Sequence, residues 1–319
     1  MREIAATVVG SSPRTLGIVV LVAAVAVGGV ALALVATPSV ERIDAEFGTV
    51  NDTHTEIRAD LLVDAPVGTG PVDGSADYTV AMNDVVVAGG DEDGVSLEPG
   101  QSSVSTSTHM SNDRVPAWWV THIDNDERTD VVVDATITTP VPGWDAAVSD
   151  HRTVETDVLG SLESNETRPI DADLALVDDP VLYVTATRAE WGAVDENRTE
   201  LEVDADAYNP TAFDASVREL SYTVRLNDVV VGDGETSRND TLEAENETTL
   251  DATVDVENDA LGEWWVTHLE NDQVSTLEIV FEVRIELPTG GTVTVDVEPF
   301  PDATIETDLF DDESDDGDG

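Results

Sequence analysis

One five-residue sequence, Trp-Trp-Val-Thr-His, occurs twice in the chain, at residues 118–122 and 264–268. The chain has six tryptophans, and four of them lie in these two pairs. An acidic residue, an asparagine and an aspartate follow soon after each pair, at residues 124–126 and 270–272. A match of this kind indicates an internal duplication, which restricts the fold to one built from two like units.

The duplication extends well beyond the tryptophans. Residues 78–87 align with residues 222–231, where both copies keep a tyrosine, an Asn-Asp pair and a run of three consecutive valines. Because each copy is of domain size, the sequence predicts a tandem of two like domains rather than a solenoid. We place the first domain at 41–160, a linker at 161–180, the second domain at 181–310 and a disordered acidic tail at 311–319.

Beyond the N-terminal region, apolar and polar residues alternate. Leu277, Ile279, Phe281, Val283 and Ile285 occupy every second position of the longest such stretch. This period is typical of a half-buried antiparallel strand. Several such strands separated by Gly, Asn and Asp turns predict an all-β fold of two tandem antiparallel β-sandwiches.

Three turns and two further strands can be placed from the sequence. Two-residue turns are expected at Asn83-Asp84 and Asn227-Asp228, since Asn and Asp tolerate positive φ. A third tight turn is expected at Gly290-Gly291. We also expect each Trp-Trp-Val-Thr-His sequence to be a strand, with one tryptophan in the core and the other beside the histidine near the strand end.

The composition is strongly acidic. The formal net charge is −54, and all fourteen basic residues are arginines. Such a charge strains a compact fold by self-repulsion, but molar salt shortens the Debye length to ~3 Å and screens most of it. We therefore interpret the chain as a halophilic protein, with a disordered acidic chain and a calcium buffer as the alternatives. Regular alternation of apolar residues argues against disorder, and the lack of clustered basic residues argues against nucleic-acid binding.

Residues 16–35 are apolar throughout, and twenty such residues can span a hydrocarbon core of ~30 Å. Arg2 and Arg14 precede them, which predicts a cytoplasmic N-terminus at 1–15, a transmembrane helix at 16–37 and the domains outside the cell membrane. A cleaved signal peptide is the alternative interpretation. Export also makes five Asn-x-Ser/Thr sequences candidate glycosylation sites, although some are expected by chance in a Thr-rich chain. These sites are Asn51, Asn165, Asn197, Asn239 and Asn246.

Trp118, His122, Trp264 and His268 are the candidate binding residues because both copies contain them. One interpretation is a partner-binding patch made of an aromatic ring beside a titratable one. The other, which we favour, is a structural histidine bonded to its neighbours. The chain has no cysteine, no second histidine at metal-ligand spacing and no Gly-x-Ser-x-Gly sequence. We therefore expect no metal, no cofactor and no enzymatic activity.

With these elements placed, the chain resembles the late embryogenesis abundant group 2 family, also called the water stress and hypersensitive response (WHy) domain. Asn209-Pro210 resembles the family's Asn-Pro motif, residues 220–232 resemble its strand, turn and return strand, and residues 304–308 resemble its closing strand. The first copy departs from the motif, with Ala65-Pro66 in place of Asn-Pro. The resemblance implies immunoglobulin- or fibronectin III-like β-sandwiches, no catalytic residues and a role in desiccation or salt stress.

Two functions follow as hypotheses. The first is a membrane-anchored protein outside the cytoplasm that protects stressed client proteins or the envelope. The second is an immunoglobulin-like binding or assembly module that links a membrane complex to the cell surface or to a ligand, through an unknown protein partner.

Overall fold

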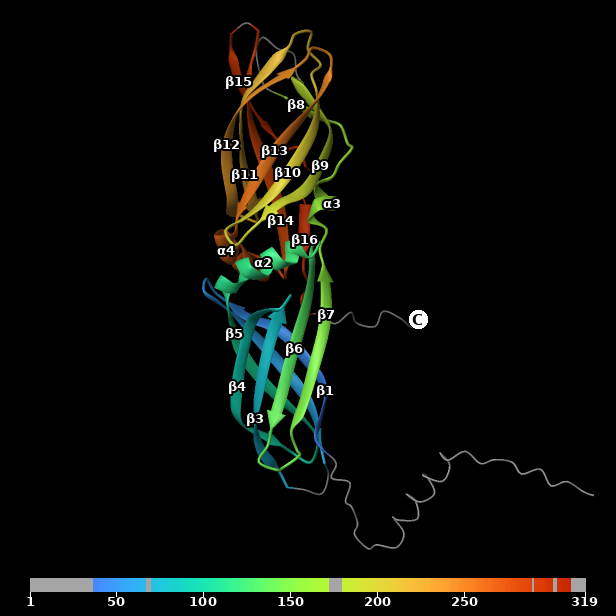
Figure 1. Cartoon of the computed structure of the whole chain (residues 1–319), viewed down its shortest axis with the longest axis vertical. Helices are drawn as coiled ribbons and strands as arrows, with labels where there is room; N and C mark the ends of the chain where they lie inside the picture. Colours follow the sequence, from blue (N-terminus) through green and yellow to red (C-terminus); the bar gives the residue numbers. More distant parts are fainter. Residues whose placement is uncertain (1–36, 67–69, 172–179, 289, 301–302, 311–319) are drawn as a thin grey trace, which may run out of the picture. The chain divides into compact units, whose positions relative to one another are not determined.

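The computed structural model describes residues 37–66, 70–171, 180–288, 290–300 and 303–310. The predicted cytoplasmic N-terminus, residues 16–36 of the predicted transmembrane helix and the predicted acidic tail lie outside these ranges. Within them, no helix has both the length and the apolar character needed to cross a membrane. The described chain is all-β, with strands in four antiparallel sheets (Figure 1).

The first copy forms two of these sheets. One has the strand order β1-β2-β5 and the other the order β4-β3-β6-β7. Their strands are β1 (Ser39–Val50), β2 (His54–Ala65), β3 (Val72–Met82), β4 (Val85–Leu97), β5 (Gly100–Ser111), β6 (Arg128–Thr138) and β7 (Ala146–Glu155).

The second copy repeats this arrangement with additions at the edges. One sheet has the order β13-β10-β9-β8, and the other has the order β12-β11-β14-β15, with β16 also paired to β14. Their strands are β8 (Arg168–Ile170), β9 (Leu182–Val194), β10 (Arg198–Tyr208), β11 (Ala215–Leu226), β12 (Val229–Leu242), β13 (Glu247–Glu257), β14 (Val274–Glu286), β15 (Thr292–Val297) and β16 (Ala303–Glu306).

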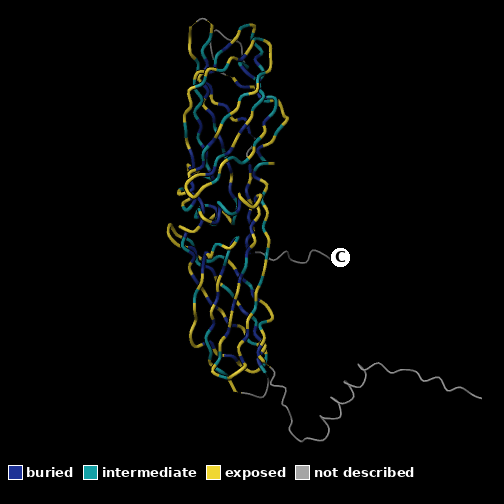
Figure 2. Tube along the Cα trace, viewed as in Figure 1, coloured by how far each residue is buried: buried dark blue, intermediate teal, exposed yellow. Residues whose placement is uncertain are grey.

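The predicted alternation is confirmed in the strands. In β14, Leu277, Ile279, Phe281, Val283 and Ile285 are all buried, and buried and exposed residues alternate along the traces of the strands (Figure 2). Because successive side chains point to opposite faces of a strand, this pattern gives each sheet one apolar face, which packs against the other sheet of the same copy.

The predicted turns are confirmed in position. Asn83 and Asp84 have φ values of 47° and 65°, as a tight hairpin turn between β3 and β4 requires. Asn227, with φ 53°, occupies the same place between β11 and β12. The third turn is longer than expected, because β14 ends at Glu286 and β15 begins at Thr292, with Gly290 at φ 82° between them.

The Trp-Trp-Val-Thr-His sequences are helical, so the prediction of strands is wrong. A short 3-10 turn, η1 (Asn112–Arg114), leads into α2 (Val115–Asp124), and η2 (Asn258–Ala260) leads into α4 (Leu261–Glu270). Each helix connects one sheet of its copy to the other, and both lie between the two sets of strands (Figure 1).

The predicted linker is partly structured. It begins within α3 (Val158–Leu162) and contains β8, which pairs with β9 of the second copy, and Ser164 forms a bridge with Thr187. Residues 38–319 make up one compact unit that includes both copies. The predicted boundaries therefore separate two sheet pairs that share contacts, and those contacts involve the repeated tryptophans.

Candidate functional site

The spacing of buried residues explains why the repeated sequence is helical. Val115, Trp118, Trp119, His122 and Ile123 are buried in α2, and their positions follow i, i+3, i+4, i+7 and i+8. This spacing places all five on one face of an α-helix, whereas a strand would place the two adjacent tryptophans on opposite faces.

The helices end at the acid-Asn-Asp sequence that follows each pair. Asp126 and Glu127 both have positive φ values, of 55° and 58°. Asp272 and Gln273 repeat this after α4, with 54° and 61°. Two successive residues in the left-handed region cannot continue a right-handed helix, so they turn the chain into the next strand.

The four paired tryptophans form one buried cluster, which we call the tryptophan centre together with His122 and His268. Trp118 of the first copy lies against Trp265 of the second, with ring centroids 5.4 Å apart. Trp119 lies against Trp264 at 5.8 Å. Both pairs meet edge to face, the geometry that the aromatic quadrupole favours.

The second tryptophan of each pair also forms a hydrogen bond with the opposite copy. Trp119 Nε1 donates to Thr199 Oγ1 in β10, and Trp265 Nε1 donates to Thr55 Oγ1 in β2, both at 3.1 Å. The two threonines occupy equivalent positions, and each donates to an equivalent asparagine of its own copy, Asn258 or Asn112. The same surface of each copy therefore meets its equivalent, as in a two-fold symmetric dimer.

The first tryptophan of each pair bonds within its own copy, to the hydroxyl that also holds the histidine. Trp118 Nε1 donates to Thr129 Oγ1 at 2.8 Å, and His122 Nδ1 lies 2.8 Å from the same oxygen. In the second copy Ser275 takes this role for Trp264 and His268, again at 2.8 Å.

The hydrogen-bond partners assign the tautomer of His122. Thr156 Oγ1 lies 2.9 Å from His122 Nε2 and donates its own proton to Glu127 Oε2. It must therefore accept a proton from His122 Nε2. Nδ1 is then the acceptor of the Thr129 hydroxyl, whose oxygen accepts from Trp118.

Burial keeps both histidines neutral. It lowers the pKa of His122 and of His268 to about 4, because the charged imidazolium would lose its hydration. Neither ring gains or loses a proton near neutral pH, so neither is suited to act there as an acid-base group. Within the described ranges, no group of three or more potential ligands could hold a metal ion.

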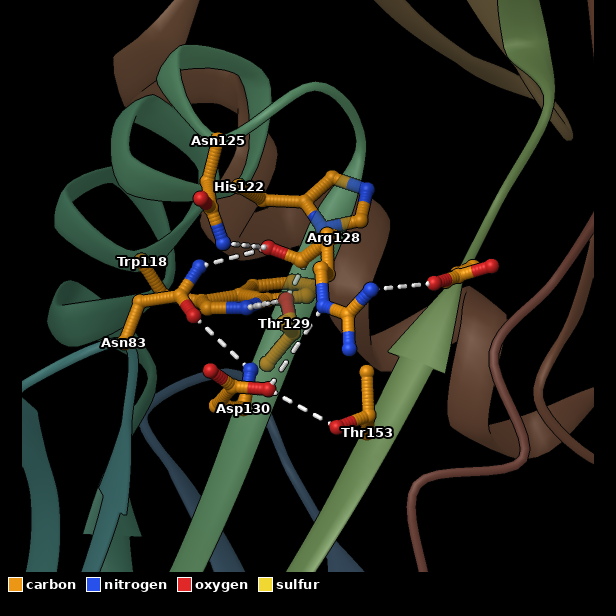
Figure 3. A network of polar contacts seen from close by, with 9 residues as sticks. Asn83, Trp118, His122, Asn125, Arg128, Thr129, Asp130 and Thr153 are labelled. Carbon is orange, nitrogen blue, oxygen red and sulfur yellow. Dashed lines mark hydrogen bonds and ion pairs between the residues drawn. The ribbon is translucent and has the colours of Figure 1, made fainter.

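Polar contacts continue outward from the centre to the hairpin of the first copy (Figure 3). Asn83 Nδ2 and Asn125 Nδ2 both donate to the carbonyl of Arg128, at 2.8 and 3.1 Å. Asn83 Oδ1 accepts from the Asp130 amide, and Thr153 Oγ1 donates to the Asp130 carboxylate. The Asn-led turn is thus bonded to the strand that follows α2, which fixes the helix relative to the sheet.

Glu127 is a second element that joins the copies. The residue is buried, at 5% exposed. It accepts hydrogen bonds from the backbone amides of Val158 and Leu159, and from Trp191 Nε1 of the second copy at 3.0 Å. Charge-assisted hydrogen bonds of this type are stronger than neutral ones.

The second copy has a neutral version of this contact. Gln273 stands at the position equivalent to Glu127, and its Oε1 accepts from the Leu309 amide at 2.9 Å. Phe47, the equivalent of Trp191, has no N–H to donate and instead packs against Trp265 and Phe310. The acid therefore occurs in the copy whose partner residue is a donor.

The predicted partner-binding patch does not form on the surface. Trp118, His122, Trp264 and His268 are 1%, 2%, 0% and 0% exposed. A patch on a free strand end would leave these side chains open to a partner, but on helices that face the opposite copy they are covered by that copy. The interpretation of a structural histidine, bonded to its neighbours, agrees with this geometry.

Asn209 of the predicted family motif is a buried turn residue, 2% exposed. Its side-chain amide donates to the carbonyls of Phe213 and Leu242, and its Oδ1 accepts from the amide of Thr211. Pro210 follows it directly and ends the strand pattern, since it has no N–H for a ladder hydrogen bond. This motif shapes a loop far in sequence from the tryptophan centre.

The five predicted glycosylation sites are all exposed, so their use as acceptors stays a prediction. Asn51 is linked to the centre by hydrogen bonds, because its backbone oxygen accepts from Asn112 Nδ2 and Asn112 Oδ1 accepts from Thr55. All five side chains are on the solvent side: Asn51, Asn165, Asn197, Asn239 and Asn246.

Sequence reasoning missed the residues that hold the tryptophan N–H groups. Thr55 and Thr199 are both fully buried threonines, and Asn112 and Asn258 are their buried partners. The repeat itself could have indicated them, since each occurs at equivalent places and each asparagine precedes an aspartate just before the helix. Glu127 and Trp191 could not be found in this way, because the other copy has Gln273 and Phe47 instead.

The comparisons with known proteins bear on the second copy. Residues 204–299 match the model of a family described as late embryogenesis abundant protein. This match supports a late embryogenesis abundant family for the chain. The matched segment runs from within β10 to just beyond β15, which covers the Asn209-Pro210 motif, α4 and most of the second sheet pair. None of the curated proteins matches the chain.

Several solved structures are similar to parts of the chain. A protein from Archaeoglobus fulgidus is 26% identical over 40% of this chain and 98% of its own length, with a TM-score of 0.36. A protein from Arabidopsis thaliana is 17% identical over 40% of this chain and 89% of its own, at 0.32. The sporulation control protein Spo0M from Bacillus subtilis is 13% identical over 53% of this chain and 80% of its own, at 0.26.

Proposed function

We propose that the protein is a non-catalytic stress-protection protein of the late embryogenesis abundant group 2 type, acting in desiccation or salt stress. The observation that carries this proposal is the family match over residues 204–299. The first copy shares the duplicated elements of the second, so the proposal treats both as domains of the same type.

The chemistry of the described residues is compatible with such a role. The two histidines are neutral and enclosed, and both are bonded to hydroxyls rather than facing a cleft. The carboxylates that give the net charge of −54 lie mainly on the outer faces of the strands. A dense layer of carboxylates binds water and keeps protein surfaces apart by repulsion.

The location of this activity is part of the proposal. Arginines before an apolar stretch of twenty residues support an anchor in the cell membrane at 16–37, with the domains outside. Protease added to intact cells tests it. Digestion of the domains with protection of an N-terminal tag supports the proposed orientation, whereas full protection of the domains contradicts it.

The alternative proposal is a binding or assembly module with an immunoglobulin-like fold. It relied on an exposed patch at the Trp-Trp sequences, and the burial of those side chains removes that basis. Any partner would instead have to use an outer surface or a strand edge. Replacing Trp118 or Trp264 therefore tests folding, not partner capture.

Protection can be tested with a fragile client enzyme that is dried and rehydrated beside residues 38–319, the compact unit. The matched control is an unrelated folded domain of similar size and net charge at the same mass concentration. Greater recovery of client activity than with this control supports the proposal. Equal recovery means that acidity alone explains the effect, and the proposed specific role then fails.

A further inference from the structure

The second copy contains an apolar cavity between its two sheets that the tryptophan centre does not use. It has a volume of about 60 Å³. Its walls come from both sheets: Val184 and Val203 lie on one side, and Val217, Phe281 and Val283 lie on the other. The surface that these walls present is almost wholly apolar, so the cavity favours an apolar occupant over water.

The cavity exists where the second copy has smaller residues than the first. In the first copy Leu61 and Val63 point into the core and are 1% and 0% exposed. Ala205 and Ala207 stand at the equivalent positions and line the cavity. The strand register establishes these equivalences: Leu61 pairs with Ile43, Ala205 with Thr187, Val63 with Val40, and Ala207 with Val184.

Charged side chains surround the mouth of the cavity, at the neighbouring edges of β12 and β13. Arg238 crosses this edge, with its guanidinium donating to the Asp240 carboxylate at 2.7 Å and to the Asp251 carbonyl at 2.6 Å. Its side chain is only 15% exposed, whereas that of Asp251 is 82% exposed. The stem of the arginine thus covers apolar surface while its charged end remains bonded at the rim.

The first copy lacks this arrangement. In its edge strand β4, the bulge opposite Ser75 and Gly74 contains Gly94, with φ +79°. The bulge of β12, opposite Val217 and Glu219, contains Arg238 instead. Both the smaller wall residues and the arginine at the mouth are therefore particular to the second copy.

We propose that this cavity binds the end of a single alkyl chain whose head group carries no negative charge. The volume is well below the about 150 Å³ of a cavity that holds benzene, so it admits a narrow chain end and not a ring. The rim carries the Asp240 and Asp251 carboxylates and one guanidinium, which is already bonded to both of these residues. The two carboxylates would repel an anionic head. This inference goes beyond the proposed stress function and does not depend on it.

The test uses the purified full chain in molar NaCl, kept soluble by an amphipathic polymer. The probe is a long-chain primary alcohol with a diazirine near the end of its chain, and labelled peptides are identified by mass spectrometry. We expect the label on β10, β12 or β13 of the second copy. Unlabelled alcohols from ethanol to octanol should compete, each added methylene strengthening competition about fourfold until the cavity is filled.

The matched variant is Ala205→Leu combined with Ala207→Val, which introduces the residues of the first copy. It should abolish labelling of the second copy and leave the melting temperature unchanged or higher, because the cavity is then filled. A carboxylate-headed chain of the same length should compete more weakly than the alcohol.

Either of two results from these comparisons would overturn the proposal. One is equal labelling of the filled variant and the wild type, and the other is competition that does not depend on alcohol length. If the double variant does not fold, the length series on the wild type still decides the question. Label found only outside the second copy would also contradict it.

Discussion

Truncation of Trp265 should allow the two copies to unfold in separate transitions. This side chain is 0% exposed. Two of its ring contacts, with Phe47 at 5.6 Å and Trp118 at 5.4 Å, are made to the first copy, as is its hydrogen bond to Thr55. Much of what Trp265→Ala removes is therefore contact between the copies rather than packing within one of them.

The expected loss can be estimated from these contacts. Removing a fully buried tryptophan ring costs about 3–5 kcal/mol. The hydrogen bond adds about 1 kcal/mol, since Thr55 still has Asn112 as a partner. A loss of about 4–6 kcal/mol corresponds to a fall in melting temperature of about 10–20 °C for a chain of this size.

The assay is calorimetry in molar NaCl, with tryptophan fluorescence recorded in parallel. We expect the wild type to unfold in one transition and Trp265→Ala to unfold in two, because the copies no longer stabilise each other. Trp265→Phe keeps a ring but cannot donate to Thr55. The lost hydrogen bond and the smaller ring together should cost about 2 kcal/mol, and the variant should retain one transition.

Trp144→Ala is the matched control. Trp144 is also buried, at 6% exposed, but it lies outside the main core cluster and makes none of the ring contacts between the copies. Its truncation should lower the melting temperature while the chain still unfolds in one transition. The reasoning is refuted if Trp265→Ala unfolds in one transition within a few degrees of the wild type, or if Trp144→Ala also separates the copies.

Three further predictions concern charge. Both His122 and His268 have a folded pKa of about 4, against an ordinary value near 6.5 in the unfolded chain. The contribution of each histidine to the free energy of unfolding is therefore complete above pH 6.5 and falls by about 1.4 kcal/mol per pH unit until about pH 4. Urea unfolding at pH 7.5 and 5.0 measures this fall, and the His122→Gln, His268→Gln double variant should show a smaller one. Glu127→Gln should lower the free energy of unfolding by about 1–2 kcal/mol, because it weakens the charge-assisted hydrogen bonds. In denaturant titrations, the double variant with Trp191→Phe should lose less than the sum of the two single variants. Strict additivity would contradict a direct contact between the two side chains. Raising NaCl from 0.1 to 1 M shortens the Debye length from ~10 to ~3 Å and should raise the melting temperature of this −54 chain; an equal rise with sucrose of matched osmolality would mean that screening is not the cause.

Local sequence pattern alone determined many of the strands and the positions of their turns. A hydrophobic period of two indicates which side chains face the core wherever one face of a sheet is buried. For that reason the buried set of β14 and the positive φ values at Asn83 and Asp84 follow directly from the residues. The duplication likewise predicted that one architecture would appear twice.

The same kind of pattern was present but misread at the repeated tryptophans. Helical spacing runs from Val115 to Ile123, yet a helix of ten residues gives less than three turns of evidence. A short apolar stretch of this length is ambiguous between helix and strand by periodicity alone. Only a helix places two adjacent tryptophans on the same buried face. That both are buried can be recognised only when the surface of the opposite copy that covers them is known.

Only the tertiary structure decided what covers that surface. Trp119 bonds to Thr199, and Trp265 bonds to Thr55. These contacts depend on how two folded copies meet, and no local preference of either segment specifies them. The cavity of the second copy arises in the same way, because Ala205 and Ala207 leave space only in relation to the opposite sheet. The sequence by itself determined the elements and their repetition. The packing between elements determined which residues lie in a core, form a contact between the copies or line a cavity. Packing depends on the shapes of side chains brought together from distant parts of the chain, so no local pattern specifies it.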